Sequence, residues 1–236
     1  MSFIITVHTN EGIIMASDSR TTYNFTNILA DGTIKQTIGS QITDTTYKTF
    51  LCNSRIGIST CGAANINQIP VAGYIEKFIA EKVSDESTVD SISQDLMIYF
   101  DNLCSGLEID FLVDGYNKGN LTPKVNQVFV SNKNIKQQDT SCPGAIWDGE
   151  ITTLSKLVMP IGIKQIDGTY IDMPNNRIGF NFFTLQDAIN FANYAVDITI
   201  KTMAFENCAK TVGGPIDILA IKPNNAFWIA RKELHA

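Results

Sequence analysis

The sequence predicts an α+β fold, in which antiparallel strands and helices form separate layers. Two short apolar runs, 3–8 and 13–17, flank the polar residues 9–12, which is typical of a β-hairpin. Two helical patterns then follow each other, over 69–83 and from Ser87 or Thr88 as N-cap. Strands that come in adjacent hairpins, with helices grouped between them, indicate α+β layers and not the strand–helix alternation of a parallel sheet.

Turn residues and apolar spacing assign the other elements of the first half. Residues 21–44 are polar and predict a long excursion with its own hairpin, which turns at Asp31-Gly32. Two more strands are expected at 47–52 and 55–60. The apolar faces of the two helices consist of Ile69, Ala72, Ile75, Ile79 and Val83, and of Val89, Ile92, Leu96, Tyr99 and Leu103.

The second half repeats this order loosely. A long helix is predicted after Thr184, a favourable N-cap residue, with Asp187 in its first turn. The other expected elements are strands at 125–131, 145–147, 216–221 and 226–230 and a short helix at 152–158.

Composition limits the classes of function. The 236 residues suit a single domain over 1–236, and 44% of them are hydrophobic, as in ordinary globular proteins. A net charge of −6 disfavours a nucleic-acid or anionic-membrane partner, because both reward a basic surface. No targeting segment or membrane span is recognisable, so we expect a cytoplasmic protein.

Several common chemistries lack their residues. The two histidines, His8 and His235, are far apart, and there is no G-x-S-x-G or phosphate-binding glycine motif. Neither a metal site nor a cofactor is expected from these spacings. The five cysteines are scattered, which predicts buried free thiols and no disulfides: Cys52, Cys61, Cys104, Cys142 and Cys208.

One catalytic arrangement needs no histidine, because a residue at the start of a chain can use its own α-amine as the base. An amine of this kind has an unperturbed pKa of about 7.7–8.0 and is partly neutral near pH 7. Ser2 is placed for this role once Met1 is removed, and cells commonly remove methionine before a small residue.

Three segments resemble proteasome β-subunits and their bacterial relatives. Residues 12–20, Gly-Ile-Ile-Met-Ala-Ser-Asp-Ser-Arg, resemble the strand that closely follows the family's N-terminal nucleophile. Residues 47–50 and 55–64 resemble the lysine-bearing strand, its hairpin partner and the glycine-alanine start of the first helix. Residues 213–218 resemble the glycine pair and strand after the long late helix.

The resemblance implies a four-layer αββα sandwich, with two stacked antiparallel sheets flanked by helices, as in N-terminal nucleophile (Ntn) hydrolases. It implies that Ser2 attacks a peptide or amide bond and that Lys48 lowers the proton affinity of the Ser2 hydroxyl and amine. Asp18 would hold Lys48, and the Gly62 N–H would stabilise the oxyanion. A peptide or protein substrate and a homo-oligomeric ring or stack are also implied.

Other positions are supporting or depart from the family. Arg20 would support the site, and Asp148 would substitute for a supporting serine in the middle of the chain. Ala209 and Val212 stand where active members have an aspartate and a serine. Lys35 is a rival to Lys48, but it lies in the polar excursion.

Three interpretations of function therefore remain open. The first is an Ntn-type peptidase or amidohydrolase. The second, motivated by Ala209 and Val212, is a catalytically silent subunit that serves assembly or ligand binding. The third is an unrelated α+β domain.

Overall fold

Two five-stranded antiparallel sheets form the centre of the computed structural model, which describes residues 2–29, 31–174 and 176–233. Met1 and His235 lie outside the described residues. The first sheet has the order β12 (Gly144–Gly149), β1 (Phe3–His8), β2 (Ile13–Ser17), β15 (Asp217–Lys222) and β16 (Asn225–Ala230). The second has the order β11 (Asn134–Gln137), β10 (Lys124–Phe129), β9 (Ile109–Gly115), β6 (Ile56–Gly62) and β5 (Thr49–Asn53).

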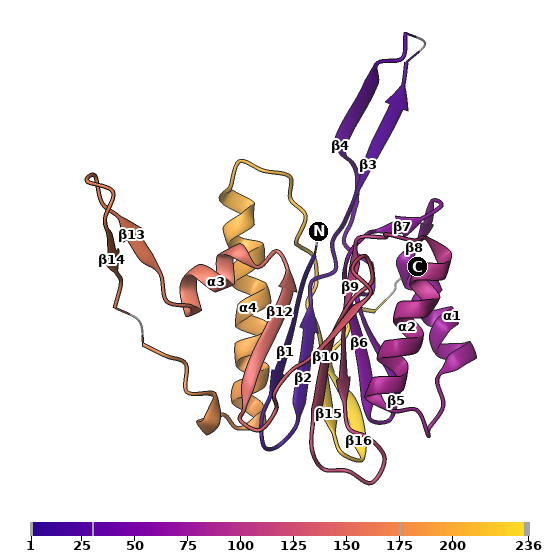
Figure 1. Ribbon diagram of the computed structural model, residues 1–236, viewed down its shortest axis with the longest axis vertical. Helices are drawn as coiled ribbons and strands as arrows, with labels where there is room; N and C mark the ends of the chain where they lie inside the picture. The colour runs from indigo at the N-terminus through magenta and orange to yellow at the C-terminus, as the bar shows by residue number, and fades with distance from the viewer. Residues whose placement is uncertain (1, 30, 175, 234–236) are drawn as a thin grey trace.

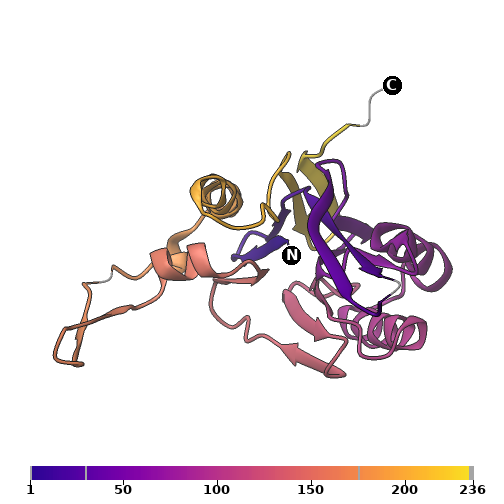
Figure 2. The ribbon, with the colours of Figure 1, turned by 90° about the horizontal axis from the view of Figure 1, so that it is seen from above.

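Helices cover the outer face of each sheet, so the molecule has four layers (Figures 1 and 2). The helices are α1 (Val71–Lys82) and α2 (Val89–Leu103) on the second sheet, and α3 (Thr152–Val158) and α4 (Leu185–Phe205) on the first, with a 3₁₀ turn, η1, at Phe180–Phe182. This arrangement confirms the predicted αββα sandwich.

Strand β1 shows why the layers stack in this way. Its alternate residues Phe3, Ile5 and Val7 pack into the apolar cluster beneath α4, whereas Ile4 packs between the two sheets. Since helices cover one face and the second sheet covers the other, every residue of β1 is buried. A strand buried on both faces reads as a continuous apolar run, as this one does.

Two helices start at predicted capping residues, α4 after Thr184 and α2 after Thr88, the second of the two candidates Ser87 and Thr88. Thr88 accepts a hydrogen bond from the Ser91 N–H, and Thr184 accepts one from the Asp187 N–H. In both cases the third helical residue bonds back to the cap, which completes a capping box. Helix α1 starts later than expected, at Val71, because Pro70 precedes it and Ile69 pairs in a short hairpin, β7 (Asn65–Ile66) and β8 (Ile69–Pro70).

Strand β9, the centre of the second sheet, was not predicted from the sequence. Asp110 and Asp114 interrupt its apolar run, and an acidic residue in mid-strand is unfavourable for a buried position. Asp114 is nevertheless fully buried and accepts a hydrogen bond from the hydroxyl of Thr6 on the opposite sheet. A contact between two sheets has no local signature in the sequence.

Two hairpins extend beyond the sandwich (Figures 1 and 2). The predicted excursion is the hairpin β3 (Thr21–Ile28) and β4 (Ile34–Thr43), which is confirmed. The second hairpin, β13 (Gly162–Lys164) and β14 (Tyr170–Asp172), was not predicted and carries exposed Ile163, Tyr170 and Ile171. Among the described residues, no helix is long and apolar enough to cross a membrane.

Candidate active site

Ser2 is held from two sides at the start of β1. Its carbonyl accepts a hydrogen bond of 2.8 Å from the Glu150 N–H, and the N–H of Phe3 donates to Asp18 at 3.0 Å. Gly149 approaches so closely that a Cβ there would lie 1.8 Å from the Ser2 carbonyl oxygen, and its φ of +88° also favours glycine. The position of Ser2 therefore depends on a glycine that the sequence analysis did not identify as functional.

A buried ion pair joins Lys48 and Asp18. The Lys48 ammonium lies 2.7 Å from the Asp18 carboxylate, and the two side chains are 4% and 0% exposed. Asp18 also accepts hydrogen bonds of 3.0 Å from the N–H groups of Arg20 and Gly213, and Lys48 also donates to the Arg20 carbonyl. The carboxylate is thus fixed by backbone donors as well as by its cation, which is the arrangement that makes a buried charge tolerable.

Burial lowers the pKa of Lys48, because the ammonium loses its hydration. Asp18 opposes this shift, and the nearby Lys232 adds to it. Lys232 is itself buried in a second ion pair, with Asp217. Of the three ammonium N–H groups of Lys48, two have partners, and the third has none among the residues that the structure describes. This proton is available to a group in the adjoining pocket.

Ser2, Lys48 and Gly62 line one pocket, together with Thr21 and Thr60. Gly62 ends β6 with a φ of +96°, and a Cβ there would lie 2.4 Å from the Glu108 carbonyl oxygen. Only glycine fits this position without displacing backbone. The structure therefore brings together the predicted nucleophile, lysine and oxyanion glycine, with Asp18 directly behind Lys48. Lys35, the rival lysine, is exposed on the β3–β4 hairpin.

Arg20 contacts the site through its backbone and anchors the chain through its side chain. The guanidinium forms two hydrogen bonds of 2.7 Å with the carboxylate of Asp44. It lies against Gly213, where a Cβ would be 2.5 Å from the Arg20 Cζ. This packing explains the first glycine of the Gly213-Gly214 pair, and it holds the Arg20 carbonyl that binds Lys48.

The segment before this glycine pair contains Ala209 and Val212, the two positions at which the sequence departs from the resemblance. Val212 is buried in the apolar cluster beneath α4, next to Met203, and Ala209 is exposed. Neither offers a polar side chain to the site. The segment still contributes through its backbone, because the Gly213 N–H donates to Asp18.

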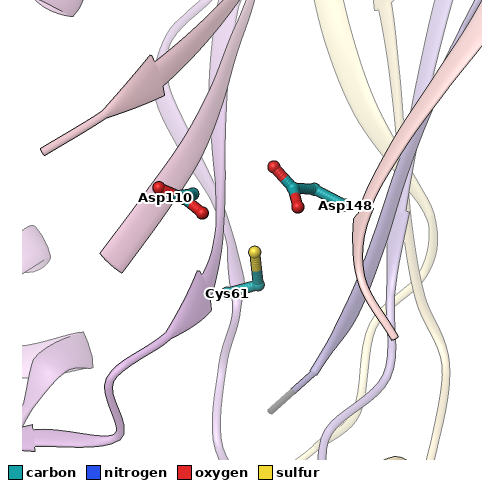
Figure 3. A group of neighbouring side chains, drawn as sticks. All are labelled: Cys61, Asp110 and Asp148. Atoms are coloured by element: carbon teal, nitrogen blue, oxygen red, sulfur yellow. The ribbon is translucent and has the colours of Figure 1, made fainter. Parts of the chain in front are cut away.

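Asp148, the predicted supporting residue, lies in a separate group with Cys61 and Asp110 (Figure 3). The Asp148 carboxylate accepts a hydrogen bond of 3.2 Å from the side chain of Gln127. Burial and the charge of Asp148 raise the pKa of Asp110 to about 6, and burial also raises the pKa of the Cys61 thiol. Sequence analysis missed this group, since its members lie on three strands with no shared spacing.

All five cysteines are free, as predicted, but their burial was predicted correctly only in part. Cys61 is buried and Cys52 is half-buried. The prediction of burial is wrong for Cys104, Cys142 and Cys208, which are exposed on turns after helices and between strands. Loops lie at the surface because their backbone needs water as a partner.

The four-layer sandwich is a proteasome-like fold of the Ntn type, and solved structures support that assignment. The chain is similar to the Anbu (Gly-1) mutant from Hyphomicrobium sp. strain MC1, with 17% identity, a TM-score of 0.62 and coverage of 98% of this chain and 86% of that one. It is also similar to Anbu (ancestral beta-subunit) from Yersinia bercovieri, with 15% identity, a TM-score of 0.61 and coverage of 96% and 87%. At this identity the likeness shows the fold alone. The sequence matches no known protein-family model. It matches no curated protein either.

Proposed function

We propose that this chain is a proteasome-like Ntn hydrolase that cleaves peptide or amide bonds, with Ser2 as the nucleophile after removal of Met1. The observation that supports this most is the pocket shared by Ser2, Lys48 and Gly62, backed by the buried Asp18–Lys48 pair. A buried ammonium that lines the same pocket as a serine and keeps one N–H without a described partner would stabilise an alkoxide there.

In this mechanism the free Ser2 amine accepts the hydroxyl proton, directly or through a water molecule. The Ser2 oxygen attacks the carbonyl carbon of the substrate, and the Gly62 N–H stabilises the resulting oxyanion. The proton then passes to the leaving amine as the amide bond breaks, which yields an acyl-enzyme. A water molecule, activated by the same amine, hydrolyses this ester and restores Ser2. Asp18 keeps Lys48 charged and in place throughout.

Covalent labelling tests this proposal. Intact-mass measurement of protein from its native host should first show loss of Met1. The Met1-free protein should then gain the mass of an electrophilic peptide inhibitor, and peptide mapping should place the adduct on Ser2. Ser2→Ala should keep a free amine but lose labelling, and any peptidase kcat/KM should fall by at least about a thousandfold, as when other catalytic nucleophiles are removed.

The control is Ser105→Ala, which removes an exposed hydroxyl that does not line the pocket and should label normally. Absence of labelling in Met1-free wild-type protein would count against the hydrolase, as would equal labelling of the Ser2→Ala variant.

A second candidate is a catalytically silent subunit, and one specific observation favours it. Val212 and Ala209 provide no polar support on the side of the site where active relatives of the proteasome type carry it. On this alternative, Ser2→Ala leaves every activity unchanged. The labelling experiment therefore separates the two candidates.

Under either candidate we propose that the chain works in the cytoplasm as a homo-oligomer, either a ring or a stack. The β13–β14 hairpin supports this, because it extends away from the sandwich (Figure 2). Its side chains Ile163 and Ile171 are exposed. Exposed apolar side chains on a projecting arm are typical of surfaces that are covered in an assembly. Native mass spectrometry of wild type and Ile163→Asp/Ile171→Asp should show several copies in the first and fewer in the second. A monomeric wild-type chain would contradict the proposal.

A further inference from the structure

A thiol and two carboxylates converge beside the pocket from three strands of both sheets. Cys61 lies on β6, Asp110 on the neighbouring β9, and Asp148 on β12 of the first sheet. One possible ligand atom from each side chain lies within 4.8 Å of the other two. Figure 3 shows the Cys61 sulfur pointing into the space between the two carboxylates.

The Cys61 thiol is an independent sign of a ligand. It is 4% exposed and has no hydrogen-bond partner in the part of the chain that the structure describes. A buried thiol normally points into apolar packing. Cys61 packs at the edge of the apolar cluster between the sheets, yet its sulfur also lies within 4.8 Å of two carboxylate oxygens, which repel a thiolate and which a cation would join to it.

The carboxylates also lack a cation of their own. Neither Asp110 nor Asp148 forms an ion pair with any described residue, and the nearby Lys48 is already paired with Asp18. Asp148 is oriented by hydrogen bonds from Gln127 and from the Gly149 N–H, and Gln127 in turn accepts one from Gln138. Carboxylates that bind metals are commonly held by hydrogen bonds of this kind from residues that do not bind the metal themselves.

We propose that Cys61, Asp110 and Asp148 bind a zinc ion. A thiolate with two carboxylates is a mixed soft and hard donor set, which suits a borderline divalent cation better than magnesium or calcium. Tetrahedral zinc needs ligand atoms about 3.5 Å apart. Small rotations of the three side chains would bring their ligand atoms to this separation. Binding displaces the thiol proton to solvent and leaves a fourth position for water.

The ion would lie beside the pocket, because Cys61 directly precedes Gly62 and lines the same pocket as Ser2. Zinc binding does not depend on the chemistry of Ser2, so this proposal and the proposed hydrolase can fail separately.

Direct metal titration tests the site. The starting protein carries Cys104→Ser, Cys142→Ser and Cys208→Ser, which removes the exposed thiols that bind metals non-specifically. Zinc affinity is measured by competition with a chromogenic chelator, and cobalt is used as a spectroscopic probe. We expect one zinc ion per chain and the near-ultraviolet charge-transfer band of cobalt bound to sulfur.

Three variants on this background test two ligands and the residue that orients the third. Cys61→Ser should abolish the cobalt band and weaken zinc binding at least about tenfold, and Asp110→Asn should weaken it similarly. Gln127→Ala should keep the band but lower affinity by about tenfold, since it only orients Asp148. Circular dichroism checks that each variant folds. If Cys61→Ser does not fold, the zinc affinity of Asp110→Asn tests the site instead, because Asp110 is only half-buried.

The proposal is overturned if the starting protein binds no zinc, or if Cys61→Ser and Asp110→Asn both leave the affinity and the cobalt spectrum unchanged. Loss of binding on replacement of the exposed cysteines alone would also overturn it.

Discussion

Replacing Lys48 with methionine is expected to destabilise the protein by about 3–5 kcal/mol, because it leaves a buried carboxylate without its cation. Asp18 is fully buried, and the backbone donors that remain cannot replace a positive charge. Methionine has a similar volume, so packing changes contribute little. Urea unfolding monitored by circular dichroism measures the effect.

Lys133→Met is the matched control. Lys133 lies at the same 2.7 Å from Asp101, but its side chain is 60% exposed. Solvent and salt screen an exposed pair, so its removal should change stability far less than loss of the buried pair. Similar losses of stability in the two variants would contradict the prediction, because the buried Asp18–Lys48 pair would then stabilise the protein no more than an exposed pair does. If Ser2 is the nucleophile, Lys48→Met should also lose inhibitor labelling under conditions where it is folded.

The second large effect expected is a pH-dependent gain in stability from Asp114→Asn. Burial raises the pKa of Asp114 from 3.8 to about 7, more than the hydrogen bonds from Thr6 and the Asn126 N–H lower it. A carboxyl with a raised pKa binds its proton more tightly in the folded state. The stability gained from this tighter proton binding is therefore fully present below about pH 4. It is lost as the pH rises to about 7, where the folded protein releases the proton.

Above that range, wild type carries a penalty on the order of 4 kcal/mol that the amide avoids. Asparagine resembles the protonated acid, since it can accept from the Asn126 N–H and donate to the Thr6 hydroxyl. The variant should therefore be more stable than wild type near pH 8, and the difference should shrink towards pH 4.

Chemical unfolding at several pH values provides the measurement. Asp101→Asn, at an exposed carboxylate paired with Lys133, should show no such gain. A stability difference between Asp114→Asn and wild type that does not change with pH, or a loss of stability near pH 8, would contradict the raised pKa of the buried Asp114 carboxyl.

The location of Asp114 relates stability to the candidate site. Thr6 lies on β1, a few residues after Ser2, and Asp114 lies on β9, next to the β6 strand that ends at Gly62. The bond between them fixes one sheet against the other, and the pocket is built from both sheets. The Thr6–Asp114 bond therefore contributes to the packing of the two sheets that together carry the pocket.

The sequence by itself determined the local elements and the order of the motifs. The hairpin of β1 and β2, the capped starts of α2 and α4, and the hairpin that turns at Asp31-Gly32 were all predicted, because turn residues, caps and apolar period act over a few neighbouring residues. The motifs around Asp18, Lys48 and Gly62 also indicated the four-layer fold, because their order along the chain matches a known arrangement.

Only the tertiary structure decided which distant side chains meet. Strand β9 was missed because Asp110 and Asp114 read as exposed residues until a second sheet covers them. Gly149 was not recognised as a site residue because its constraint is the Ser2 carbonyl, on a different strand. Cys61, Asp110 and Asp148 likewise converge only through strand register and sheet stacking. These contacts depend on free energies summed over the whole core, which no local pattern of residues contains.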